Sequence, residues 1–250
     1  MHDPSTALGI SARRSDTAQS PQLLLAVDTS GKSGSLALAR VTHGQTEVEV
    51  VEVVPLTGGT FSAQLIPQLS ASLAKHGYSK SDLAGFAAVS GPGSFTGLRV
   101  GLAAIKALAE VWQKPIAAVS LLEAIATSGN IQGRVLAAVD AGRGEVYAGD
   151  YEINGSDKDR HVRMHSERLL GREEFLTEAR GKAVITPNAN LFEILEAAAI
   201  RAERIQYPGS AVIARLGWEK IERGQTVRPE DLEANYIRRS DAEIFSQPKP

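Results

Sequence analysis

Two aspartates that close apolar runs are the first residues of this chain that could do chemistry. Asp28 ends "LLLAVD" and Asp140 ends "VLAAVD", and each is followed by a turn that contains glycine. A carboxylate at such a position can bind Mg²⁺ or orient a phosphate, but it also accepts hydrogen bonds from the N–H groups of its own turn. Turn capping is the commoner role, so Asp28 and Asp140 are only weak candidates for nucleotide binding.

The turn after Asp28 contains Gly31-Lys32-Ser33, a triplet that is typical of phosphate-binding loops. Such a loop needs a glycine five residues before the triplet and a helix directly after it. Position 26 is Ala26, and "SGSLALARV" alternates with a period near two, which indicates a strand. The sequence therefore predicts strand, turn and strand here rather than a P-loop.

A second glycine loop, "GPGSFTG", runs from residue 91 to residue 97. It is one residue too long for the dinucleotide fingerprint. Ser94 does not stand in a G-x-S-x-G elbow, and no histidine lies in a motif that could serve it, so a peptidase is disfavoured. We expect a tight turn, with Ser94 or Thr96 capping a helix that begins near Leu98.

Metal ligands are scarce in this sequence. The chain has no cysteine, which excludes disulfides and thiolate sites. His161 and His165 have a spacing that metal sites use, but they stand among charged residues without helical periodicity, so we expect a solvated strand face. The sequence predicts no metal and no resident cofactor, with weak nucleotide binding left open.

Composition indicates a soluble globular protein. Of 250 residues, 43% are hydrophobic and 22% are charged, and the net charge of -2 gives no broad surface for nucleic acid or anionic lipid. Residues 1–21 are polar and aperiodic, which predicts a mobile extension. Arg13-Arg14 lacks the long apolar segment of an export signal, and no run is long enough to span a membrane, so we expect a cytoplasmic protein.

The order of expected elements repeats along the chain. The first half reads as a hairpin over 23–41, a strand near 46–56, a helix from a Ser62 cap to a Gly77 stop, a strand over 83–90 and a second helix. The second half opens with the same strand, Ala-Val-Asp, turn and strand, which favours an internal duplication. We predict an α/β fold of two stacked lobes with a cleft: 22–116 joined by 225–245, and 117–224.

Four stretches carry a family resemblance: "LLLAVDTS", "VSGPGSFTGLRVGLAAIKALA", "VSLLEAIA" and "VLAAVDAGRGEVYAGDYE". Together they resemble the TsaB (YeaZ) family of the bacterial tRNA threonylcarbamoyladenosine pathway, from Leu23 to Tyr151 and weakly again over 232–239. This family is a degenerate TsaD-like member of the actin, hexokinase and Hsp70 superfamily. The resemblance implies a duplicated actin-like ATPase (ribonuclease H-like) fold, in which each lobe is a mixed β-sheet with flanking helices.

The resemblance also implies a role. Proteins of this family are non-catalytic partners of TsaD, the subunit that adds threonylcarbamoyl to adenosine 37 of tRNAs reading codons that start with A, and TsaE joins the complex. A homodimer is implied when TsaD is absent.

Two departures fit an inactive copy of TsaD: "GGTFSAQLIPQL" lacks the metal histidines of TsaD, and Pro187 and Asn188 stand where an adenine-binding glycine pair is wanted. The alternative is a small-molecule phosphotransferase or ATPase on the same fold, supported only by Asp28 and Asp140.

Two expected helices of the first lobe carry more apolar and small residues than one sheet-facing side requires. Periodicity alone is equally compatible with buried helices, whereas the resemblance favours a surface that binds TsaD or a second copy. The residues predicted for this interface are Leu65, Ile66, Leu69, Leu73, Leu98, Gly101, Leu102, Ala104, Ile105, Leu108 and Trp112.

Overall fold

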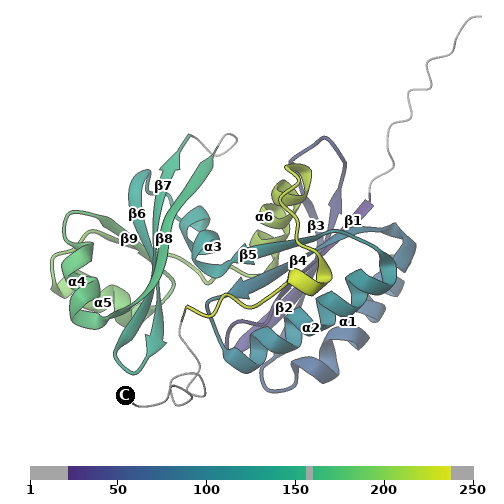
Figure 1. The fold of residues 1–250 in the computed structure, drawn as a ribbon, viewed down its shortest axis with the longest axis horizontal. Helices are drawn as coiled ribbons and strands as arrows, with labels where there is room; N and C mark the ends of the chain where they lie inside the picture. Colours follow the sequence, from purple (N-terminus) through teal and green to yellow (C-terminus); the bar gives the residue numbers. More distant parts are fainter. Residues whose placement is uncertain (1–21, 156–159, 238–250) are drawn as a thin grey trace, which may run out of the picture.

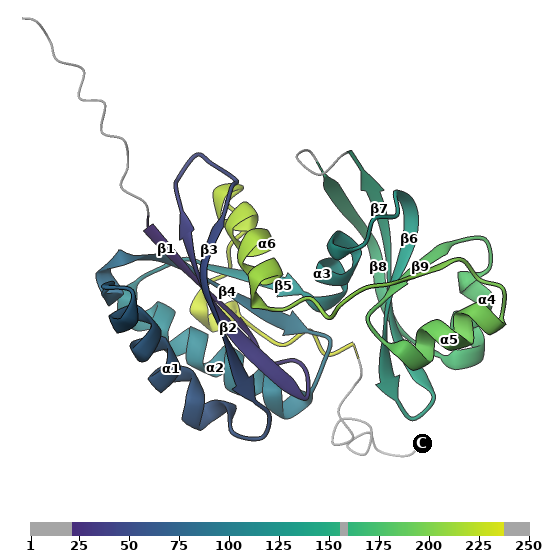
Figure 2. The ribbon, with the colours of Figure 1, turned by 180° about the vertical axis from the view of Figure 1, so that it is seen from behind.

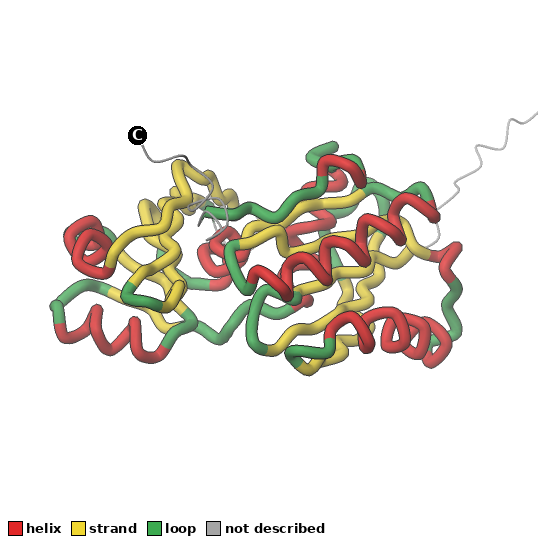
Figure 3. The backbone as a smooth tube through the Cα atoms, turned by 60° about the horizontal axis from the view of Figure 1, so that its bottom comes forward, coloured by secondary structure: helices red, strands yellow, loops and turns green. Residues whose placement is uncertain are grey.

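The computed structural model describes residues 22–155 and 160–237, which form two lobes (Figure 1). The predicted extension over 1–21 and the end of the predicted segment 225–245 lie outside the described residues. In both lobes, helices flank the strands (Figure 3). No helix in the described ranges combines the length and the apolar character that a membrane crossing requires.

The first lobe contains a five-stranded sheet with the order β3-β2-β1-β4-β5. Its elements are β1 (Gln22–Asp28), β2 (Ser33–Val41), β3 (Glu49–Thr57), α1 (Phe61–Lys75), η1 (Lys80–Asp82), β4 (Leu83–Gly91), α2 (Phe95–Trp112), β5 (Ile116–Ser120) and α3 (Leu121–Ser128). β1 pairs antiparallel with β2 and parallel with β4, so the expected hairpin is present and no helix follows Gly31-Lys32-Ser33.

The second lobe repeats this arrangement with the order β10-β9-β6-β7-β8. Its elements are β6 (Gly133–Gly142), β7 (Glu145–Asn154), β8 (His161–Gly171), α4 (Arg172–Ala179), β9 (Ala183–Thr186), α5 (Ala189–Ala197), β10 (Ala202–Arg204) and α6 (Ser210–Glu222), followed by η2 (Pro229–Asp231). Each lobe is a mixed sheet with the same sequence of strands and helices, which confirms the predicted duplicated actin-like fold.

The central strands of the first sheet contain long apolar runs because both faces of the sheet are covered. β4 is buried from end to end. On one face, Phe86 stacks on Trp112 of α2 with ring centroids 5.9 Å apart, and on the other, Gly217 of α6 lies directly over Ala87. A strand that has helices on both sides must be apolar at every position, which explains the continuous run that the sequence shows.

The third helix of each repeat packs on the sheet of the other repeat. α6 follows β10 in the chain but contacts β1, β2, β4 and β5, while α3 follows β5 and contacts β6, β7 and β8. α3 and α6 therefore lie between the two sheets, whereas α1 and α2 cover the outer face of the first sheet and α4 and α5 that of the second (Figures 1 and 2).

Because α3 and α6 pack on each other's sheets, the lobes have different boundaries from the predicted ranges. The range 117–224 assigned α6 and most of β5 to the second lobe, whereas β5 is an edge strand of the first sheet and α6 covers that sheet. The physical reason is that the inner face of each apolar sheet needs a cover, and the covering helix comes from the other half of the chain.

The two helices of the first lobe begin slightly before their expected positions. α1 starts at Phe61 with Thr60 as its N-cap residue, rather than at the Ser62 cap that the sequence suggested. α2 starts at Phe95, and Ser94 caps it by accepting a hydrogen bond from the Gly97 N–H at 3.3 Å. Ser94 therefore has the predicted capping role.

Candidate functional site

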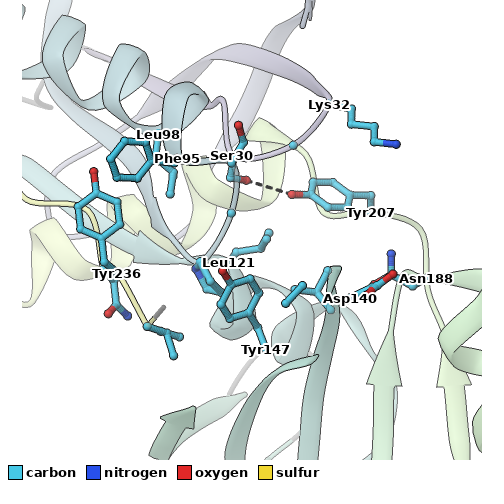
Figure 4. A pocket seen from close by; sticks show the side chains of 18 of the residues that line it. Ser30, Lys32, Phe95, Leu98, Leu121, Asp140, Tyr147, Asn188, Tyr207 and Tyr236 are labelled. Carbon is cyan, nitrogen blue, oxygen red and sulfur yellow. Dashed lines mark hydrogen bonds between the residues drawn. The ribbon is translucent and has the colours of Figure 1, made fainter. Parts of the chain in front are cut away.

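A cleft of about 1070 Å³ lies between the lobes. Its walls come from the β1–β2 turn, the start of α2, the β6–β7 turn, the segment before α5, the linker to α6 and the C-terminal segment (Figure 4). The lining residues that we discuss are Ser30, Lys32, Phe95, Arg99, Asp140, Arg143, Tyr147, Asn188, Tyr207, Asn235 and Tyr236. The duplicated turns of the two lobes thus face the same space.

Asp28 does not open into this cleft. Its side chain is 2% exposed, and its Oδ1 accepts hydrogen bonds from the Ser30 N–H at 2.8 Å and the Ser30 hydroxyl at 2.6 Å. Burial raises the pKa of Asp28 above its ordinary value, although the two hydrogen bonds partly oppose that shift. The carboxylate therefore organises its own turn, as the capping interpretation proposed.

The Asp28 turn is connected to the cleft through hydroxyl groups. The Tyr207 hydroxyl lies 3.0 Å from the Ser30 hydroxyl (Figure 4). Because the Ser30 hydrogen is donated to Asp28, Tyr207 must be the donor to Ser30. Desolvation and the nearby Asp28 charge both raise the pKa of Tyr207, which keeps that hydroxyl protonated as a donor.

We expect the Asp28→Asn variant to melt at a higher temperature than the parent chain at pH 7. Ionised Asp28 costs folding free energy above its raised pKa, and this cost disappears as the pH falls below the ordinary value of 3.8. Asparagine keeps the acceptor oxygen for Ser30 without the buried charge. Thermal unfolding followed between pH 7 and pH 4 should show an advantage that shrinks toward the acid end.

The control for this experiment is Asp140→Asn, the same change at the exposed, equivalent turn, which should leave the melting temperature nearly unchanged. A lower melting temperature for Asp28→Asn at pH 7 would show that the folded state requires the negative charge, contrary to our expectation.

Asp140 occupies the equivalent position of the second lobe, two residues before the end of β6, and is exposed. Its Oδ1 accepts the Gly142 N–H at 2.8 Å, which repeats the contact between Asp28 and Ser30 two residues on. Its own N–H donates to Asn188 Oδ1 at 2.8 Å. Asn188, where a glycine would admit an adenine ring, therefore ties the start of α5 to the β6–β7 turn.

The histidine pair lies on the second lobe, far along the edge strand from these turns. His161 and His165 are both on β8 and both exposed, and His165 Nε2 lies 3.7 Å from Glu152 Oε2. Among the described residues, no three His, Cys, Asp or Glu side chains are grouped so that they could hold a metal ion.

The predicted interface residues divide into two groups in the structure. Seven face the core of the chain and cannot contact a partner, which corrects their assignment: Leu65, Leu69, Leu73, Leu98, Gly101, Leu102 and Ile105. Ala104, Leu108 and Trp112 are half-buried, and Ile66 is 44% exposed. The sequence pattern could not separate the sheet-facing stripe from the outer stripe because both are apolar.

Gly101 has a different role from the predicted one. We expected its small size to let a partner helix approach, but a Cβ at Gly101 would lie 2.2 Å from the Thr29 hydroxyl oxygen, and a Cβ at Gly97 would lie 2.1 Å from the Thr29 carbonyl oxygen. Thr29 in turn donates its hydroxyl hydrogen to the Gly97 carbonyl at 2.8 Å. These glycines let α2 cross the end of β1 within the chain.

One side of α1 and one side of α2 are apolar or small, although the exposed, charged Arg99 and Glu110 lie beside this side on α2. We name as the α1–α2 face the residues at spacing i, i+3, i+4, i+7 and i+11 on both helices, which share one side of each helix. They are Ala63, Ile66, Pro67, Ser70 and Ala74 on α1, and Val100, Ala103, Ala104, Ala107 and Val111 on α2. Val111 is 75% exposed, although valine usually avoids such a position.

A carboxylate that the sequence analysis missed joins the two lobes. Glu167 of β8 accepts hydrogen bonds from the Tyr151 and Ser120 hydroxyls, and its Oε2 accepts the Asn235 amide at 2.9 Å. Ser120 ends β5 of the first sheet. Asn235 belongs to the C-terminal segment, whose backbone N–H donates to the Ser90 carbonyl at 2.7 Å. Three parts that are distant in sequence meet at one side chain.

The C-terminal segment also supplies a cleft wall. Tyr236 packs against Phe95 with ring centroids 5.1 Å apart, and its hydroxyl accepts a hydrogen bond from Arg99 Nε at 3.0 Å. The Arg99 guanidinium lies 3.7 Å from the centre of the Phe95 ring. The stretch "LEANYIRR" was the only signal in the sequence that pointed to this segment.

Two stacked repeats with exchanged helices and an interlobe cleft define the class of duplicated actin-like proteins. A family model described as TsaD, tRNA N6-adenosine threonylcarbamoyltransferase, matches residues 38–165, and the chain belongs to this family. Within it, the predicted resemblance to TsaB (YeaZ) is confirmed by the relatives that follow.

Two curated relatives are named tRNA threonylcarbamoyladenosine biosynthesis protein TsaB. The Bacillus subtilis protein is 33% identical over 52% of this chain and 55% of its own length. The Escherichia coli protein is 34% identical over 52% of this chain and 54% of its own length. This chain thus matches about half the length of these relatives. A Pseudomonas aeruginosa structure described as an uncharacterized protein with similarity to peptidase YEAZ has a TM-score of 0.69 at 25% identity, over 87% of this chain and all of that one.

Proposed function

We propose that this chain is a non-catalytic, cytoplasmic partner subunit of the complex that adds threonylcarbamoyl to adenosine 37 of tRNA, and that it binds and supports TsaD. TsaE is the further proposed member of the complex, and tRNA is reached through the assembly. When TsaD is absent, we expect two copies of the chain to pair through the surface that TsaD otherwise occupies.

The observation that carries this proposal is the α1–α2 face. The side chains at these ten positions on two packed helices are uncharged, and two of the larger ones, Ile66 and Val111, are 44% and 75% exposed. Exposed apolar side chains on adjacent helices are typical of a protein interface. Small residues at most of the positions allow helices of a partner to approach closely.

The contacts in the cleft disfavour the alternative, a small-molecule phosphotransferase or ATPase. Each of the two aspartates accepts a hydrogen bond from its own lobe: Asp28 from Ser30 and Asp140 from Gly142. Neither side chain is therefore fully available to a bound phosphate or Mg²⁺. Asn188, at a position where the resemblance implies an adenine-binding glycine, instead accepts a hydrogen bond from the Asp140 N–H. The peptidase mentioned for the Pseudomonas relative finds no support at Ser94, which caps α2.

The test is reconstitution of tRNA modification from purified parts. Threonine, bicarbonate, ATP, tRNA, TsaD, TsaE and the enzyme that makes the threonylcarbamoyl adenylate are combined with and without this chain. We expect modified tRNA only when the chain is present, as measured by mass spectrometry of the nucleosides. Equal product in both reactions would overturn the proposed role.

A second prediction concerns the isolated chain. With Mg²⁺ and ATP alone we expect no turnover above a buffer blank, because Asp28 and Asp140 accept hydrogen bonds from Ser30 and Gly142 in their own lobes. Phosphate release is the measurement, and Asp28→Ala is the informative variant. ATP hydrolysis that this variant abolishes would support the phosphotransferase instead.

A further inference from the structure

We propose that the interlobe cleft binds an unpaired nucleotide, with the base stacked on aromatic rings and the phosphate contacted by basic side chains. The nucleotide chemistry follows from the cleft itself, whereas the choice of an RNA strand as its source rests on the proposed function.

Aromatic rings are concentrated at the mouth of the cleft. Seven large hydrophobic side chains of the described chain are exposed, and three of them line this one cleft: Phe95 at 40%, Tyr207 at 42% and Tyr236 at 41%. Tyr147 adds a fourth ring from the second lobe (Figure 4). Partly exposed tyrosine and phenylalanine rings in a groove are stacking surfaces for bases, which offer a π-face whatever their sequence.

The charge of the cleft is opposite in sign to that of the whole chain. Lys32, Arg99 and Arg143 line it, and Asp140 is the carboxylate among its described lining residues. The chain as a whole has a net charge of -2. Local positive charge on an otherwise slightly acidic protein favours an anionic ligand at this position, and arginine is suited to phosphate through its planar donors.

Arg99 brings positive charge and the aromatic wall of the cleft together. Its guanidinium is held 3.7 Å from the centre of the Phe95 ring and is hydrogen-bonded to the Tyr236 hydroxyl. A cation fixed in an aromatic wall places a group that can contact phosphate next to a stacking surface.

The size of the cleft favours a strand over a single free nucleotide. Its volume of about 1070 Å³ is slightly above the range for small-molecule pockets, roughly 300–1,000 Å³. Binding in this way does not involve the Asp28 carboxylate, which is buried beneath Ser30, so we expect no requirement for Mg²⁺. This independence separates the proposed site from that of a Mg²⁺-dependent ATPase.

The experiment uses the full chain and a fluorescein-labelled, unstructured oligoribonucleotide of about ten nucleotides, with fluorescence anisotropy as the readout. We expect binding that persists in EDTA and weakens between about 50 mM and 200 mM salt. Tyr207→Ala should weaken it about tenfold, whereas Tyr207→Phe, which keeps the ring but loses the hydrogen bond to Ser30, should bind nearly as well as the parent chain.

A charge variant and its control complete the test. Arg143→Gln should weaken binding about fivefold and flatten the salt dependence, and Arg163→Gln, the same change on exposed β8 outside the cleft lining, should have little effect. No binding by the parent chain, equal loss in Arg143→Gln and Arg163→Gln, or equal affinity for a duplex of the same sequence would overturn the proposal. Competition by AMP at the same nucleotide concentration would assign the site to free nucleotides and overturn RNA as the source.

Failure of the cleft proposal and failure of the proposed function give different results. A chain that binds the oligonucleotide yet is dispensable for tRNA modification would retain the cleft site and lose the role as a TsaD partner. A chain that is required for tRNA modification but binds no oligonucleotide would keep the role as a TsaD partner and lose the cleft site.

Discussion

Replacing Ala107 with glutamate is expected to abolish co-purification with TsaD while the isolated chain stays folded. Ala107 is exposed at the centre of the α2 part of the α1–α2 face. A partner helix would bury the new carboxylate without a counter-charge, which should cost several kcal/mol of binding free energy and reduce affinity on the order of a hundredfold or more. The measurements are affinity capture of TsaD and the circular dichroism melt of the free variant.

Ala197→Glu is the matched control, because it makes the same change at an exposed helical position of α5 in the second lobe. It should bind TsaD as the parent chain does. If Ala107→Glu still captures TsaD, the interface lies elsewhere on the chain. Ala104→Glu is less informative, since Ala104 is half-buried against the core and the variant could fail through misfolding.

The second large effect is expected for Gly97→Ala, which should destabilise the fold although alanine is the better helix former. In an open helix this change would gain up to about 1 kcal/mol. Here a Cβ at Gly97 would lie 2.1 Å from the Thr29 carbonyl oxygen, and the backbone must move to relieve the clash. We expect a loss of about 1–3 kcal/mol or more, which lowers the melting temperature by roughly 2–12 °C.

Gly171→Ala is the control for this variant. Gly171 has a φ of -63°, and a Cβ added there would have no other atom within 4 Å, so the change should cost only the weaker N-cap preference of alanine at the start of α4, well below the loss in Gly97→Ala. A Gly97→Ala chain that melts at or above the parent temperature would show that α2 and β1 are less closely packed than the structure indicates.

The fold was largely predictable because buried strands and turn aspartates leave strong local patterns. Asp28 ends β1 and Asp140 lies two residues before the end of β6, and each accepts a hydrogen bond from the backbone N–H two residues on, as their repeated sequence suggested. The exchange of α3 and α6 was not predictable in this way. Periodicity shows that a helix has an apolar side, but two sheets with similar apolar faces compete for it, and only the three-dimensional arrangement decides.

The candidate site was harder to predict for the same reason. On α2, Leu98 and Ile105 face the sheet and Ala107 and Val111 face solvent, yet all are apolar or small. The cleft is formed by Tyr207, Tyr236 and Asn235 from late in the chain, next to Phe95 from its first half. A single sequence does not show that residues this far apart lie together. The role of Glu167 likewise becomes visible only in the structure, where Ser120, Tyr151 and Asn235 all donate hydrogen bonds to it.

The exchanged helices also determine the order in which the protein can be completed on the ribosome. Domains usually fold as units while the chain is being made, with the N-terminal part first. Here the first sheet is synthesised early but must wait for α6, and for the segment that carries Asn235 and Tyr236, before its inner face and cleft wall are covered. The second sheet, whose inner cover α3 has already emerged, can close before the first, so the half of the protein that is translated last is finished sooner.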